Sequence, residues 1–163
     1  MQLSLSRLGR NLEHVAGEGY AMSSDAYAVA GIVAVLLPTI YFLIASPTFL
    51  LAKFDDPSVT WLMRGLFSLH FRIICIGAVV SIVAFVIAGR PFFVLIPAVI
   101  ASLAVAMRRW FLRHIDAELS ARDAGDARAA QRLRRLHVRG MALNATQCVA
   151  LIAFIPLVFG TAM

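Results

Sequence analysis

Apolar residues gather in four long stretches along this chain, separated by short polar or charged segments. The stretches cover residues 27–45, 65–89, 92–109 and 140–160. A helix needs about 20 predominantly apolar residues to cross a bilayer. The pattern therefore predicts an all-α, polytopic membrane protein. Its four transmembrane helices should form an antiparallel bundle, with residues 27–163 as one four-helix transmembrane domain.

Charged positions continue the last two stretches beyond their apolar parts. Residues 92–107 pass into the charged residues 108–123 with no proline or glycine at the junction, and the chain turns at Ala124, Gly125 and Asp126. Residues 127–139 then lead back into the last apolar stretch. We expect helices 3 and 4 to extend out of the membrane as a helical hairpin over residues 108–139.

Proline and glycine mark the other connections. Pro47 should end the first helix, because the residue before a proline resists the α conformation. Asp56 and Pro57 form a helix-start signal after a polar connector. Residues 89–91 read Gly-Arg-Pro, which predicts a tight turn between antiparallel neighbours. Pro38 lies inside the first stretch, where neighbouring helices can satisfy the carbonyl that a proline frees.

The first 26 residues differ from the rest of the chain. Polar residues interrupt the leucines, so no continuous apolar core of a signal peptide forms. Leu5, Leu8, Leu12 and Val15 fall near one helical face, which indicates an amphipathic segment lying in the membrane interface. A frayed terminus is the alternative interpretation of residues 1–26.

The basic residues predict the orientation. Twelve of the 15 lie on the side of the connector and the long hairpin, whereas Arg7, Arg10 and Arg90 lie on the side of the termini. Short loops rich in Lys and Arg stay in the cytoplasm. We therefore expect a bacterial-type inner (plasma) membrane protein with a cytoplasmic hairpin and both termini outside. The net charge of +6 follows this asymmetry, and we expect no nucleic acid partner.

Three histidines share the predicted cytoplasmic side. Counting residues from each turn puts His114 and His137 at nearly the same height, and His70 about one helical turn nearer the lipid. Because neutral imidazole is the commonest metal ligand, one interpretation is a haem or transition-metal site built from His70 and His137, with His114 as a further ligand. The other is a polar network that fixes helix packing.

Helical spacing predicts which polar residues face the bundle. His70 shares a face with the small residues Gly77, Ser81, Ala84 and Ala88, so it should point into the bundle. Asn144 and Gln147 lie in apolar sequence, where an unpartnered amide is costly. Pro97, Ala101, Ala104 and Arg108 make a similar small face in the third stretch. The predicted polar bundle network comprises His70, Arg72, Arg108, His137, Asn144 and Gln147.

Other polar residues have simpler interpretations. His114 and Glu118 are four residues apart, which predicts a solvated surface pair. Cys75 and Cys148 lie in apolar stretches and should be buried. The basic residues nearest the last apolar stretch should face phospholipid headgroups or dock a partner; they are Arg132, Arg134, Arg135 and Arg139.

Signatures of catalysis do not occur in the sequence. There is no GxSxG, no glycine-rich phosphate loop and no HExxH. Asp55 and Asp56 could each offer a carboxylate to a cation, although a solvated connector also explains them. The sequence thus leans away from an enzyme, without deciding the question.

Three short sequence patterns resemble those of a known family. Residues 45–49 read Ala-Ser-Pro-Thr-Phe, residues 64–67 read Arg-Gly-Leu-Phe, and Leu136-His137 is followed by Leu143-Asn144. Over about residues 27–160 these motifs resemble those of a small four-helix membrane family of unknown function, the transmembrane protein 205-like domain family. The resemblance implies a fold and a topology; it implies no activity.

Three hypotheses for function follow. The first is an integral inner-membrane protein without its own catalytic centre, acting as an accessory or assembly subunit of a larger membrane complex, with a protein partner or a homo-oligomer in the bilayer and no cofactor. The second is a metal- or haem-binding membrane protein, which a visible absorption spectrum and metal analysis would test. The third is transport of a small solute or ion by a homo-oligomer.

Overall fold

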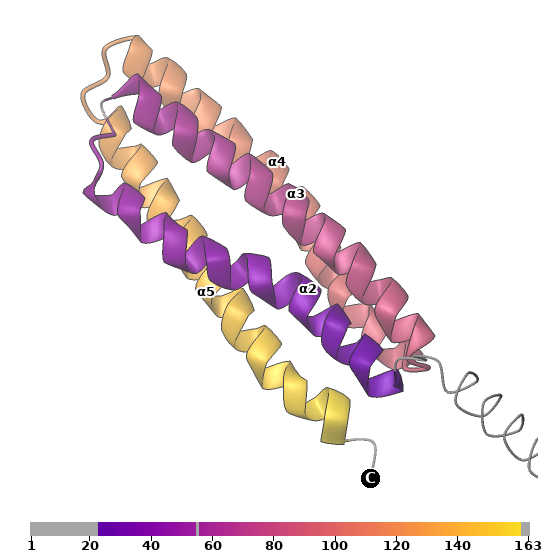
Figure 1. The fold of residues 1–163 in the computed structure, drawn as a ribbon. Coiled ribbons are helices and arrows are strands. Elements are labelled where there is room, and N and C mark those ends of the chain that lie inside the picture. The colour runs from indigo at the N-terminus through magenta and orange to yellow at the C-terminus, as the bar shows by residue number, and fades with distance from the viewer. Residues whose placement is uncertain (1–22, 55, 161–163) are drawn as a thin grey trace, which may run out of the picture.

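The computed structural model describes residues 23–54 and 56–160, and within them the chain is helical throughout its regular structure (Figure 1). The four long helices are α2 (Ser24–Ala45), α3 (Pro57–Ile87), α4 (Leu95–Asp123) and α5 (Ala129–Gly160). Two short 3₁₀ helices connect them, η1 (Ser46–Leu51) and η2 (Pro91–Val94). The predicted all-α, four-helix architecture is confirmed. The amphipathic segment predicted for residues 1–26 lies mostly outside the described residues.

The helices pack as antiparallel neighbours around one core. Contacts join α2 to α3, α3 to α4, α4 to α5 and α5 back to α2. One end of the bundle carries η1 and the loop between α4 and α5, and we call it the hairpin end. The other carries the α3–η2 turn, the start of α2 and the end of α5, and we call it the turn end (Figure 1).

Local signals in the sequence explain where the helices begin and end. The Ser23 side chain accepts a hydrogen bond from the N–H of Ala26 at the start of α2, and Asp56 accepts one from Ser58 at the start of α3. Gly89 (φ 69°) and Gly125 (φ 90°) follow α3 and α4 in the left-handed conformation that glycine adopts without strain. Both predicted turns are therefore present at the predicted glycines.

Each long helix presents large apolar side chains to the outside of the bundle, among them Leu37, Ile76, Leu95 and Leu157. Soluble proteins rarely expose apolar surface on this scale. All four helices are long and apolar enough to cross a membrane. The molecule is therefore built as a multi-pass membrane protein, in agreement with the prediction from the sequence.

Small residues let α2 and α3 approach closely. A Cβ atom added to Gly77 would lie 2.3 Å from the carbonyl oxygen of Ala34. Ala34 is four residues before Pro38, so its carbonyl is the one that this proline leaves without a helical N–H. The bare backbone of Gly77 therefore covers the carbonyl that Pro38 frees, as expected for a proline inside a lipid-embedded helix.

At the turn end, one arginine joins three helices. The Nη1 atom of Arg90 donates a hydrogen bond to the Val158 carbonyl of α5 (2.6 Å), and its Nη2 atom pairs with Asp25 of α2. The Ser24 hydroxyl donates to the carbonyl of Ala88 at 2.6 Å. The short turn after α3 is thereby tied to the first and last helices.

Candidate functional site

His137 lies fully buried where α5 meets η1. Its Nε2 atom is 3.0 Å from the Ser46 carbonyl oxygen and 3.2 Å from the Ser46 hydroxyl. A carbonyl can only accept, so we assign the ring proton of the neutral histidine to Nε2. The buried Nδ1 atom is then an acceptor, and it has no hydrogen-bond partner in the described part of the chain. A metal ion or haem iron could reach this ring only through Nδ1.

His70 lies in a second polar contact, deeper in the bundle. The Nδ2 atom of Asn144 donates to the Thr39 carbonyl of α2 at 2.9 Å, and the Asn144 side chain also lies beside the His70 ring. The Oδ1 atom of Asn144 completes no hydrogen bond of ordinary geometry. Asn144 therefore links α5 to both α2 and α3, as the sequence predicted for an amide in an apolar stretch.

Aromatic rings separate the two buried histidines. The Phe42 ring lies 4.2 Å from the His70 ring between centroids and 5.3 Å from the Phe67 ring. Phe67 in turn meets His137 edge-on at 5.6 Å. The structure thus brings His70 and His137 into one aromatic core, with phenylalanine side chains packed against both.

His114 lies outside this core. Its Nδ1 atom hydrogen-bonds the Trp110 carbonyl at 2.8 Å, and its ring stacks on Trp110 with centroids 4.1 Å apart. Leu136 and Arg139, the neighbours of His137 on α5, share a pocket with His114. The predicted common height of His114 and His137 agrees with this placement, but His137 points to the other side of α5, toward Ser46.

The predicted surface pair of His114 and Glu118 is wrong. Glu118 pairs with Arg132 across the hairpin at 2.7 Å, and Arg132 also pairs with Asp126 at 2.7 Å. The planar guanidinium of Arg132 offers a carboxylate charge-assisted hydrogen bonds of favourable geometry. The His114 ring instead folds back over the preceding helical turn.

The predicted polar network forms only in part. Arg108 donates to the Ser68 hydroxyl at 3.3 Å, and the Nε2 atom of Gln147 is buried without a partner in the described part of the chain. Arg72 does not belong to the network, because it lies on the exposed face of α3. Arg72 lies near the end of the apolar stretch that is toward the hairpin end. From the exposed face of α3, its long side chain can extend to water.

Acidic and thiol groups are dispersed. Within residues 23–54 and 56–160, no group of three or more His, Cys, Asp or Glu side chains could hold a metal ion. Cys148 is buried, as predicted, whereas Cys75 is only half-buried. Asp56 is used as the N-cap of α3, while Asp55 lies outside the described residues.

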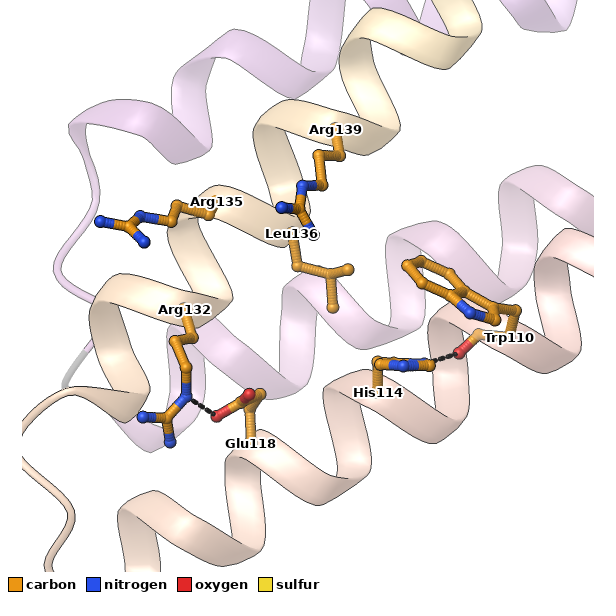
Figure 2. A pocket seen from close by; sticks show the side chains of 7 residues that line it. All are labelled: Trp110, His114, Glu118, Arg132, Arg135, Leu136 and Arg139. Atoms are coloured by element: carbon orange, nitrogen blue, oxygen red, sulfur yellow. Dashed lines mark hydrogen bonds and ion pairs between the residues drawn. The ribbon is translucent and has the colours of Figure 1, made fainter.

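A basic pocket opens between α4 and α5 at the hairpin end (Figure 2). Its volume is about 260 Å³. It is lined by Trp110, His114, Glu118, Arg132, Arg135, Leu136 and Arg139. Sequence analysis grouped the α5 arginines as one surface, but it did not predict that α4 would complete a pocket with them.

An apolar groove of about 590 Å³ runs between the same two helices farther from the hairpin end. Residues 95–107 of α4 and 143–157 of α5 form its walls, and Phe71 of α3 contributes to its lining. The sequence pattern did not predict this groove, because the pattern cannot show how far two apolar helices diverge.

Two cross-helix contacts near the hairpin end were also missed. Arg64 of α3 forms a bidentate ion pair with Asp116 of α4, with N–O distances of 2.5 and 3.0 Å. Arg122 donates to the Thr60 hydroxyl at 2.6 Å. Arg64 and Asp116 are nearly equidistant in sequence from the turn at Gly89, so the height argument applied to the histidines could have found this pair.

A comparison of the chain with known protein families, characterised proteins and solved structures finds no match. What the fold and the sites define is therefore a class: a four-helix, multi-pass membrane protein with a buried histidine–aromatic core and a basic pocket at one end.

Proposed function

We propose that this protein is an accessory or assembly subunit of a larger complex in a bacterial-type inner membrane, without a catalytic centre of its own. The hairpin end faces the cytoplasm in this proposal, and both termini face outward. The asymmetry of basic residues supports the orientation. The resemblance to the transmembrane protein 205-like family is compatible with this topology.

The main support for the proposal is the outer face of α4, little of which is covered by the other helices. In the most apolar stretch of α3, 44% of the residues are buried within the protein, compared with 11% in that of α4. Ala98, Ser102 and Ala106 recur at four-residue intervals on the less covered side of α4, with Ser102 and Ala106 exposed. Small residues at this spacing allow another helix to pack closely within a membrane.

The buried histidines fit this structural role. Ser46 and the Asn144–Thr39 contact place α5 against α2, so these polar groups fix the position of helices. Polar contacts of this kind between transmembrane helices are worth about 1 kcal/mol each. The basic hairpin would add a cytoplasmic docking surface.

Site-specific photocrosslinking in intact membranes tests the proposal. A photoreactive amino acid replaces Ala106 on the outer face of α4, and the matched control replaces Val79, an exposed residue of α3. We expect a discrete protein adduct from position 106, and lipid adducts alone from position 79. The adduct's mass distinguishes a second copy from another subunit.

The contrary result is equally clear. If position 106 also gives only lipid adducts, and the protein extracted in mild detergent migrates as a monomer without co-purifying subunits, the accessory role is wrong.

A further inference from the structure

The basic pocket and the apolar groove lie on one continuous side of the α4–α5 interface. On α5, Arg139 of the pocket is followed one helical turn later by Leu143 of the groove. On α4, Trp110 of the pocket lies three residues from Met107 of the groove. The two cavities therefore follow each other along the same pair of helices, one polar and one apolar.

The groove is long enough to hold an acyl chain across one leaflet of a bilayer. From Met107 to Leu95 the α4 wall covers 13 residues, or about 18 Å between its ends at a rise of 1.5 Å per residue. Half of a hydrocarbon core of about 30 Å is about 15 Å. Leu95, Val99 and Leu103 of this wall are about half exposed or more, so the groove is open to the surrounding lipid. An acyl chain entering at the pocket would reach the middle of the membrane.

Trp110 marks the boundary between the two cavities. Its side chain is 41% exposed and stacks on His114. Tryptophan is enriched at the level of lipid headgroups, where its ring contacts chains and its N–H reaches polar groups. The basic pocket therefore lies at headgroup level, and the groove lies in the hydrocarbon.

The positive charge in the pocket is not fully neutralised. Arg132 is engaged by Glu118 and Asp126. In contrast, neither Arg135 nor Arg139 forms an ion pair or side-chain hydrogen bond among the described residues. Figure 2 shows Arg139 directed toward the space beside Leu136, whereas Arg135 extends away from it. Arg139 is thus the cation best placed to meet an anionic group, and Arg135 adds charge one turn away.

We propose that the α4–α5 cleft seats one anionic phospholipid, with its phosphate held at Arg139 in the basic pocket and its acyl chains lying in the apolar groove. An arginine donates to phosphate oxygens through its planar fork. The apolar walls exclude water from the chains. The proposal requires that the protein reside in a membrane, but it does not rest on the accessory role, which concerns the outer face of α4.

Native mass spectrometry of the detergent-purified protein, titrated with phosphatidylglycerol or phosphatidylcholine, tests the headgroup contact. We expect one phosphatidylglycerol to bind with preference, and Arg139→Gln to weaken this binding about fivefold. Arg113→Gln is the matched control, because it removes the same charge from an exposed position outside the cleft. Arg139→Lys should retain most of the binding.

Filling the groove with a bulky side chain tests whether the acyl chains lie there. Ala150 lines the groove, and Val149 is exposed next to it on another face of α5. We expect Ala150→Trp to weaken the binding of both lipids, and Val149→Trp to leave it unchanged. Thermal unfolding of each variant shows that it is folded.

Three outcomes would overturn the proposal. Equal weakening by Arg113→Gln and Arg139→Gln would mean a diffuse electrostatic attraction. Unchanged binding in Ala150→Trp would place the chains elsewhere. A protein adduct from a photocrosslinker at Leu103, in place of a lipid adduct, would assign the groove to a partner helix.

Discussion

Gly77 shows how one residue controls a helix contact. Its backbone lies against the Ala34 carbonyl that Pro38 leaves without a helical donor. A methyl group there would meet backbone, which cannot move aside as a flexible side chain can. By comparison, a Cβ at Gly31, on the α2 side of the same contact, would come no closer than 3.1 Å, to the Ala84 side chain. The fit between α2 and α3 therefore depends on Gly77 more than on its other small neighbours.

Replacing Gly77 by alanine should destabilise the folded protein by about 3 kcal/mol, as overpacking of a tight core does. Gly65→Ala is the matched control on the same helix, because a Cβ there meets no atom within 4 Å. It should be neutral or stabilise by up to about 1 kcal/mol, since alanine favours the helix. Thermal unfolding in detergent measures both. An unchanged midpoint in Gly77→Ala would show that the helices can separate at little cost.

Helix faces could be predicted from the sequence, but partners across helices could not. His70, Gly77, Ser81, Ala84 and Ala88 were placed on one inward face by spacing alone, and all five are buried. Spacing reports direction within one helix only. It could not show that His137 would find Ser46, because that contact depends on the path of η1 after Pro47. Nor could it show which side of α5 faces α4. That side carries Leu136 and Arg139 and not His137, so His114 and His137 lie apart.

The start of α5 depends on one carboxylate in the loop. The Asp126 side chain accepts a hydrogen bond from the Arg128 N–H at 2.8 Å and pairs with Arg132 at 2.7 Å. The Arg132 hydrogen bond, helped by that of Arg128, holds the pKa of Asp126 below its ordinary value of 3.8. Asp126 therefore helps to fix the turn and the first residues of the helix that carries the basic pocket.

The order of this loop should depend on pH. Because folding lowers the pKa of Asp126, its carboxylate stabilises the turn at pH values above 3.8, and this contribution is lost as the pH falls through the lower folded-state pKa. Hydrogen exchange of peptides covering residues 123–132, corrected for intrinsic rates, should show protection near pH 6 that declines as the pH falls below 3.8. Asp126→Asn should show weaker protection than the native protein near pH 6 and the same protection once the native carboxylate is protonated. Equal protection of the two proteins near pH 6 would contradict this.

At the scale of the whole molecule, charge is segregated between the two ends. The hairpin end holds a group of arginines on α5, whereas the turn end holds Arg90, which is engaged by Asp25 and Val158. The sequence alone predicted this segregation and the four-helix bundle, because both follow from composition along the chain. It could not predict the groove between α4 and α5, which depends on how the finished helices cross.

Cysteine labelling tests the predicted orientation. Phe92 at the turn end is 92% exposed, and Arg134 lies at the hairpin end. In intact cells, an impermeant maleimide should label Phe92→Cys and spare Arg134→Cys, which should react only after the membrane is permeabilised. Both variants also carry Cys75→Ala and Cys148→Ala, so that the introduced cysteine is the only one in the chain. Labelling of Arg134→Cys from outside would reverse the orientation.

The Asn144–Thr39 contact joins the first long helix to the last. A ribosome releases α2 well before α5, so during biogenesis α2 waits in the bilayer with its side toward α5 incomplete. Until α5 arrives, α2 and η1 lack the Asn144 contact at Thr39 and the His137 contact at Ser46. The contacts that place the first long helix against the last can therefore form only after α5 has entered the bilayer.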